Sequence, residues 1–254
     1  MKIGIVVLCT NAYFPLGIRL IKRFMQFYTG EQEIKFFFFS DENPKDYLPD
    51  GYDVEYIYTT NKNWVEGTNL KFTSILYLEN RDVDYLAYFD ADSDVDKNFT
   101  EDWFIGDSVA GQHFGDLDWM KEIKGFERNP CSKAYIPFDT PLPQMYYYGA
   151  FFSFSKEKMI NFCRLMIEWQ SADKQWGYEP SCHDEAYIQR FFHYNSPSKV
   201  VLCKDFKFLI SHKGGLVDTR NMNLDTSEIK KDLKKYRNQN INIEHGKVTT
   251  DRNL

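Results

Sequence analysis

Short apolar runs alternate with amphipathic helical segments through the first third of the chain, and this alternation limits the fold more than any other feature. In the first helical segment Leu16, Leu20 and Phe24 recur at helical spacing. Strands that alternate with helices build a mostly parallel sheet with helices on both faces. We therefore predict an α/β fold. The predicted strands are Ile3–Leu8, Ile34–Phe39, Val54–Tyr58 and Asp84–Phe89, and the predicted helices are Pro15–Tyr28 and Leu70–Leu78.

The second half of the chain has a looser pattern that tightens again around three segments. A strand is predicted at Tyr146–Phe154, a helix at Lys156–Gln170 and a further helix after Ser181. The sequence has no internal repeat and no Pro/Gly-rich linker, so we predict one domain of two lobes, residues 1–96 and 97–218. Residues 219–254 are a polar, basic tail.

Composition and charge exclude several classes of function. The formal net charge is −6, and the 31 Lys and Arg residues are scattered except for a run at Lys230–Arg237 that fits a solvated helix face. Because there is no broad cationic face, a nucleic-acid partner is not expected. The apolar run at the N-terminus is too short to span a bilayer and lacks a signal-peptide pattern, so we expect no transmembrane segment.

The cysteines give a separate indication of compartment. They are odd in number, far apart, and form no CxxC pair, which argues against a disulfide framework and against structural zinc. A reducing, cytoplasmic environment fits this pattern. The cysteines are Cys9, Cys131, Cys163, Cys182 and Cys203.

An acidic segment, FDADSDVD, follows directly after the last predicted strand of the first lobe. In open α/β sheets, ligands bind at the carboxyl ends of the strands, so Asp90 and Asp92 should emerge where a substrate binds. Two carboxylates with this spacing offer hard oxygen ligands to Mn²⁺ or Mg²⁺, whose other positions diphosphate oxygens and water would fill.

Two other interpretations of the acidic segment stay open at this stage. Asp90, Asp92 and Asp94, with Glu101 at the twelfth position, resemble a calcium loop. However, Val95 replaces the glycine of the sharp turn, and a strand precedes the loop where a helix is required. The other alternative is a solvated acidic turn.

A second polar cluster, SCHDE, begins the last predicted helix. Ser181 and Asp184 have the spacing of a capping box, so these residues could simply start that helix. Alternatively, Glu185 in a water-poor pocket could act as a nucleophile or stabilise positive charge at a sugar carbon. A third segment, Tyr146–Ala150, combines aromatic faces and hydroxyls with small residues that let a ligand approach, and it fits core β-structure equally well.

Together these three segments resemble glycosyltransferase family 6, which includes the histo-blood-group A and B transferases. The resemblance begins at the first strand, ends near residue 203 and is clearest between Asp84 and Phe192. It implies a GT-A-type fold in which residues 1–96 bind the nucleotide and residues 97–218 bind the donor sugar and the acceptor. It also implies a retaining hexosyltransferase that uses Mn²⁺, with Mg²⁺ as a substitute, to move galactose or N-acetylgalactosamine from UDP to a glycan hydroxyl.

The resemblance also assigns roles to individual residues. Asp90 and Asp92 match the family's Asp-X-Asp metal site, and Tyr13 matches the aromatic residue against uracil. Lys71 stands where the family usually has an arginine beside the donor sugar, and His113 matches a histidine that contacts the acceptor. After His113 the family sequence is replaced by Phe-Gly-Asp-Leu, so the acceptor is not transferable.

The cluster at the last helix matches the family's His-Asp-Glu. His183 and Asp184 are then donor-binding residues, and Glu185 is the nucleophile or the charge stabiliser. Cys182 replaces the tryptophan that usually precedes them. Tyr148, Gly149 and Ala150 match the donor-selecting triplet, and the methyl group of Ala150 favours UDP-galactose slightly over UDP-GalNAc.

Two other functions remain as alternatives. The chain could be a UDP-sugar-binding protein or hydrolase with little transferase activity, because Lys71 and Cys182 depart from the family pattern. It could also be a retaining transferase for UDP-glucose or UDP-GlcNAc.

Overall fold

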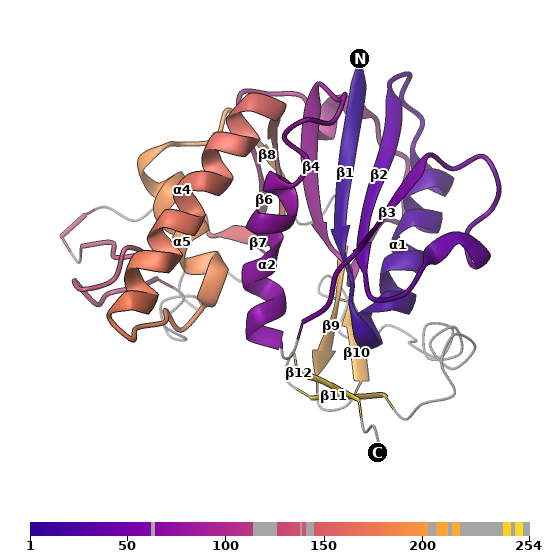
Figure 1. The fold of residues 1–254 in the computed structure, drawn as a ribbon. Helices are drawn as coiled ribbons and strands as arrows, with labels where there is room; N and C mark the ends of the chain where they lie inside the picture. The colour runs from indigo at the N-terminus through magenta and orange to yellow at the C-terminus, as the bar shows by residue number, and fades with distance from the viewer. Residues whose placement is uncertain are drawn as a thin grey trace.

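The structure is a computed structural model that describes residues 1–61, 64–113, 126–137, 139–140 and 145–202. It also describes the backbone of four later strands, which form two hairpins near the C-terminus (Figure 1). Most of the predicted basic tail, including Lys230–Arg237, lies outside the described residues. The four strands are β9 (Lys207–His212), β10 (Gly215–Asp218), β11 (Ile241–Glu244) and β12 (Lys247–Thr250).

Seven strands form the central sheet in the order β3-β2-β1-β4-β7-β6-β8. Four neighbouring pairs are parallel, whereas β7 runs antiparallel to both β4 and β6. The predicted α/β fold with a mostly parallel sheet is confirmed, and both predicted lobes contribute strands. The strands are β1 (Lys2–Leu8), β2 (Glu33–Ser40), β3 (Val54–Tyr58), β4 (Tyr85–Asp90), β6 (Val109–Gln112), β7 (Tyr147–Ser155) and β8 (Lys199–Val201).

The first strand shows why the sheet needs helices on both faces. Ile3, Ile5 and Val7 are buried in the core beneath α1 (Phe14–Phe27), whereas Val6 is buried in the core on the other face. A strand with apolar side chains on both faces must be covered twice. In Figure 1, α1 lies on one side of the sheet, and α2 (Trp64–Leu76), α4 (Lys156–Gln175) and α5 (His183–Tyr194) lie on the other.

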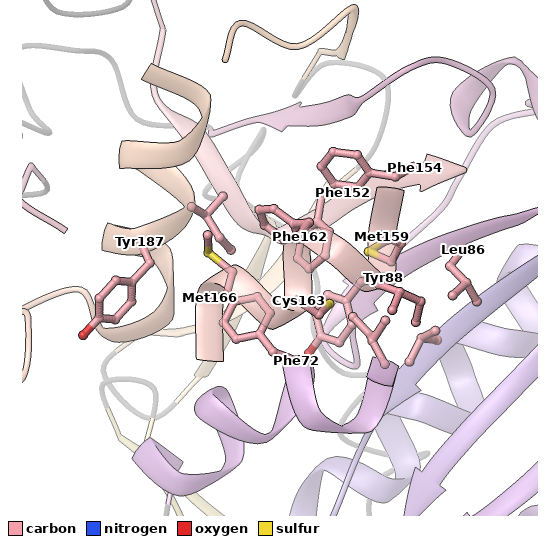
Figure 2. Packing of buried hydrophobic residues seen from close by; sticks show 14 of the residues in the cluster. Phe72, Leu86, Tyr88, Phe152, Phe154, Met159, Phe162, Cys163, Met166 and Tyr187 are labelled. Atoms are coloured by element: carbon pink, nitrogen blue, oxygen red, sulfur yellow. The ribbon is translucent and has the colours of Figure 1, made fainter. Parts of the chain in front are cut away.

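Aromatic packing fixes the helices on that second face (Figure 2). The ring centroid of Phe162 in α4 lies 6.0 Å from that of Phe72 in α2. It also lies 5.3 Å from Phe152 and 4.9 Å from Phe154, both in β7. Each buried phenylalanine contributes about 1.5–3 kcal/mol relative to an exposed one. This cluster therefore fixes α2 firmly against β7, and Lys71 immediately precedes Phe72.

The prediction from sequence missed some elements and boundaries. Strands β6 and β8 were not predicted, and α2 begins at Trp64, before the predicted start at Leu70. The acidic segment also contains a short strand, β5 (Ser93–Asp94), which pairs with β9 in a second sheet. In the part of the chain that the structure describes, none of the helices combines the length and the apolarity that a membrane span requires.

Candidate functional site

Five segments that are distant in sequence meet at one end of the central sheet. Parallel strands β1 and β4 end there, at Leu8 and Asp90. Strand β7 runs the opposite way, so its first residues, including Gly149, lie at the same end. Lys71 reaches this point from α2, and α5 begins there with Asp184 and Glu185. The structure therefore brings the acidic segment and the start of α5 together, because Lys71 contacts both.

Lys71 joins these segments. Its ammonium Nζ lies 2.6 Å from Asp184 Oδ2 and 3.4 Å from Asp90 Oδ1, and it donates to the main-chain oxygen of Gly149 at 3.0 Å. An ammonium group has three protons, so these three acceptors account for all of them. The Nζ atom also lies 4.7 Å from the centre of the Tyr88 ring. In this structure, Lys71 holds two acids and a strand in place.

Burial and charge act in opposite directions on this ion pair. The Lys71 side chain is 2% exposed, and burial alone would lower its pKa, but the charges of Asp184 and Asp90 raise that pKa overall. Burial also raises the pKa of Asp184, while the nearby ammonium lowers it. The two groups lie 2.6 Å apart, yet burial outweighs the ammonium in its effect on Asp184, so the pKa of Asp184 is raised overall.

The two acids of the predicted metal site differ in their surroundings. Asp90 Oδ1 accepts a hydrogen bond from the Tyr88 hydroxyl at 2.7 Å and also faces Lys71. Burial, and then the charge of Asp90, raise the pKa of Asp92 to about 8. Two carboxylates that compete in this way are stabilised together by any cation that binds between them.

Asp94 has a different role from the other two aspartates of the segment. Its side chain is 0% exposed, and its Oδ1 atom lies 2.6 Å from Arg19 and 3.3 Å from Arg23, both in α1. Glu101, the twelfth position of the calcium-loop alternative, instead accepts hydrogen bonds from Tyr28 and from the main-chain N–H of Glu31. The structure therefore argues against a calcium loop and shows that the segment is not a fully solvated turn.

Glu185 is held by neutral hydrogen-bond donors. The main-chain N–H of Gly149 donates to its Oε2 atom at 2.8 Å, and the Tyr146 hydroxyl also bonds to its side chain. Burial raises the pKa of Glu185 to about 7. A Cβ atom on Gly149 would lie only 3.2 Å from carboxylate oxygens of both Asp184 and Glu185. Glycine therefore permits this close approach of α5 to β7, and a larger residue would require the two carboxylates to shift.

The capping-box interpretation of the α5 start is wrong. The N-cap residue is Cys182, not Ser181, and no side-chain cap hydrogen bond forms there. Asp184 instead faces Lys71, so its carboxylate belongs to the site. His183 has a left-handed backbone with φ of 45°, and its Nδ1 atom lies 2.9 Å from Glu179 Oε1. A positive φ is uncommon for a residue other than glycine.

The remaining predicted residues lie around Tyr148. Burial and the charges of Asp92 and Glu185 raise the pKa of the Tyr148 hydroxyl well above its usual value, and Tyr13 adds a smaller effect. The His113 ring lies edge-on to the Tyr148 ring at 4.7 Å, and burial lowers the pKa of His113 to about 3, so it is neutral near pH 7. The segment that follows His113 lies outside the described residues.

Ala150 is buried in the core beneath α1. Its place in the donor-selecting triplet therefore rests on the resemblance.

Two tyrosines were missed by the sequence analysis as individual site residues. Tyr88 bonds to Asp90, and Tyr146 bonds to Glu185. A signal for Tyr88 was present, because residues two apart on a strand point to the same face. Tyr146 was noticed only as part of an aromatic run, since its bond to Glu185 depends on how α5 docks against β7.

The described side chains do not form a complete metal site by themselves. Among the residues that the structure describes, no group of three or more His, Cys, Asp and Glu side chains could hold a metal ion. A cation at Asp90 and Asp92 would therefore need further oxygen ligands from a bound molecule and from water.

Comparison with known proteins identifies similar sequences. The model of glycosyltransferase family 6 matches residues 1–219. Histo-blood group ABO system transferase 2 of Rattus norvegicus is 31% identical over 125 residues, which are 47% of this chain and 35% of that protein. Globoside alpha-1,3-N-acetylgalactosaminyltransferase 1 of Gallus gallus is 27% identical over 215 residues, 79% of this chain and 60% of that protein.

A bacterial protein is also similar. O-antigen biosynthesis glycosyltransferase WbnI of Escherichia coli is 24% identical over 204 residues, which cover 78% of this chain and 84% of that protein. The chain spans less than two thirds of the length of the rat and chicken proteins.

Proposed function

The chain belongs to glycosyltransferase family 6, and on that premise we propose that it transfers galactose or N-acetylgalactosamine from a UDP donor to a glycan hydroxyl. The observation that carries the proposal is the Lys71 bridge, which brings the acids after β4 and the acids of α5 into one site. A site of this kind offers carboxylates for a diphosphate-bound cation and a separate carboxylate for the reacting sugar. The mixed sheet is compatible with the GT-A-type fold.

The proposed metal is Mn²⁺, with Mg²⁺ as a substitute. Asp90 and Asp92 would hold it, and their hard carboxylate oxygens fit such an ion. When bound, the cation would neutralise charge on the departing nucleotide diphosphate. Tyr88 and Lys71 fix the orientation of Asp90, and in that orientation its carboxylate would bind the cation.

The proposed outcome of transfer is retention of configuration, with an α-linked product. Glu185 either attacks the sugar C1 or stabilises the positive charge that develops there when the diphosphate departs. Its carboxylate is held by neutral donors, so its negative charge is not cancelled by a direct ion pair. Asp184 and His183 are proposed to contact the donor sugar, and Tyr13 and Tyr148 to line the donor site. His113 is proposed to contact the acceptor.

For the donor we propose a slight preference for UDP-galactose, on the resemblance of Tyr148, Gly149 and Ala150 to the donor-selecting triplet. Turnover of UDP-galactose and UDP-GalNAc at equal concentrations measures this preference, and a strong preference for UDP-GalNAc contradicts it. Screening UDP-glucose and UDP-GlcNAc in the same assay tests the alternative donors.

Transfer itself is tested by incubating the protein with Mn²⁺, radiolabelled UDP-galactose and a panel of glycan acceptors. The proposal predicts a labelled product whose new linkage is α, as read by NMR. If label appears only as free sugar, or if the donor binds without turnover for every acceptor, the UDP-sugar-binding or hydrolase alternative is correct instead.

A further inference from the structure

Tyr146, which directly precedes β7, is one of the largest fully buried side chains of the described chain. Its ring lies edge-on to His113 at 5.3 Å and to Phe126 at 5.1 Å, so it is fixed from two sides. The main-chain N–H of His113 also donates to the Tyr146 main-chain oxygen at 2.8 Å. These contacts leave the hydroxyl with little freedom to change direction.

The hydroxyl bonds to the side chains of Glu185 and Cys182. An ionised carboxylate can only accept hydrogen bonds, so the one proton of the Tyr146 hydroxyl goes to Glu185. Burial and the charge of Glu185 raise the pKa of Tyr146 well above its usual value, which keeps the phenol protonated and able to donate.

We propose that Tyr146 is a positioning residue that acts through Glu185, holding the carboxylate in one orientation together with the main-chain N–H of Gly149. This inference rests on the proposed function, because it assumes that Glu185 takes part in transfer. The neighbouring cation, Lys71, is directed instead at Asp184. Two neutral donors can fix the carboxylate and leave its charge intact, whereas a direct ion pair would cancel that charge.

Several charged and polar groups surround Glu185 and affect its ionisation. Asp184 lies beside it in α5, Lys71 faces it from α2, and Gly149 and Tyr148 face it from β7. The Tyr146 hydroxyl favours the charged form of the carboxylate. Its removal should therefore raise the pKa of Glu185 and shift the acidic limb of the pH–rate profile upward.

The test compares Tyr146→Phe with Tyr147→Phe. Each change removes one hydroxyl from a buried ring. The Tyr147 ring, however, packs in the core between β7 and α5, with its centroid 5.2 Å from that of Phe192. We expect Tyr146→Phe to lower kcat by roughly 10-fold to 100-fold, the range for losing a hydrogen bond to a charged group. The KM for the donor should change little, and the acidic limb should rise. Tyr147→Phe should leave kcat, the KM for the donor and the acidic limb unchanged. Thermal melting of both variants tests whether they fold.

A double-mutant cycle separates this inference from the proposed function. In a Glu185→Gln background, adding Tyr146→Phe should not lower the rate of UDP release from the donor any further, because Tyr146 acts through Glu185. Wild-type kcat and pH profile for Tyr146→Phe, or an additive loss in the double variant, overturns the inference alone. Full activity of Glu185→Gln overturns the proposed function first.

If Tyr146→Phe fails to fold, the kcat and pH–rate profile of Cys182→Ala provide a second test. That variant keeps the Tyr146 ring and hydroxyl but removes the thiol that bonds to it. It should therefore retain kcat within about fivefold and the wild-type acidic limb, since the bond from Tyr146 to Glu185 survives. A loss of kcat for Cys182→Ala as deep as for Glu185→Gln would contradict the assigned direction of the hydrogen bond and overturn the inference.

Discussion

The turn after β4 and the first turn of α5 are both acidic, and each divides its acids between two tasks. In the turn, Asp94 is buried against Arg19 and Arg23 of α1. At the start of α5, Asp184 is paired with Lys71. In both segments, an acid bound to a basic side chain fixes the backbone. The neighbouring acid of each segment is then free from that structural task.

The second acids of the two segments differ in what surrounds them. Asp92 lies near another carboxylate, Asp90, whose charge helps to raise its pKa. Glu185 is held by the Gly149 N–H and the Tyr146 hydroxyl, which are neutral. Paired like charges suit a cation, whereas a lone carboxylate with neutral donors suits a positive charge that develops on a substrate. This difference is consistent with the proposal that the first segment binds the cation and the second acts on the sugar.

The largest expected effect is on Glu185. Glu185→Gln keeps the shape of the side chain but removes its charge, so kcat should fall by roughly 10²-fold to 10⁴-fold. Calorimetry should show that the affinity for UDP is unchanged, because the uracil and the diphosphate contact other residues in the proposed complex. The exposed Glu168 of α4 supplies a matched control, Glu168→Gln, which should behave as wild type. A Glu185→Gln variant with normal turnover would remove the distinction between the two segments.

The next effect is on stability and concerns Asp94. Asp94→Asn leaves two arginines without their buried partner, and breaking such a pair costs about 3–5 kcal/mol of unfolding free energy. Denaturant unfolding measures this loss. Asp107→Asn breaks an exposed pair with Lys158 and should leave the unfolding midpoint almost unchanged. If Asp94→Asn instead keeps full stability but abolishes metal-dependent activity, Asp94 belongs with the ligands and not with the scaffold.

A smaller effect concerns pH. In the proposed mechanism, transfer requires the ionised form of Glu185, whose pKa is raised to about 7, so kcat/KM should fall about tenfold per pH unit below that value. The sign for stability is opposite. A pKa raised from 4.5 means that the folded chain holds the proton more tightly, so stability from this group falls as pH rises through about 7. The difference in unfolding free energy between Glu185→Gln and the wild type should therefore be more favourable to the variant at pH 8 than at pH 5.

A pH–rate profile that stays flat between pH 5 and 8 would mean that Glu185 is already ionised throughout, and would weaken its contrast with Asp184.

Strands β1 to β4 and helix α1 were predictable because their signals are local. Alternating or continuous apolar residues mark each one, and the position of Asp90 and Asp92 at a strand end follows from the same pattern. Strands β6 and β8 are short, and their pairing with each other and with β7 spans distant parts of the chain. Local patterns do not carry such pairings, so these two strands were missed.

The same reason explains the errors at the site. The spacing of Ser181 and Asp184 is a local capping signal, but the ammonium of Lys71, over a hundred residues away in sequence, takes the carboxylate instead. The bonds from Gly149 and Tyr146 to Glu185 likewise depend on α5 docking against β7. The resemblance to a family located Glu185, whereas the chemistry of the residues alone left two interpretations open.

The most direct measurement is calorimetric titration of UDP into the protein with Mn²⁺ and with excess chelator, repeated for Asp92→Asn. The account predicts clear binding by the wild type with Mn²⁺, and binding at least about tenfold weaker after chelation or in the variant, because the carboxylate pair holds the cation. Equal UDP affinity under all of these conditions would contradict the assignment of the β4 turn as the cation site.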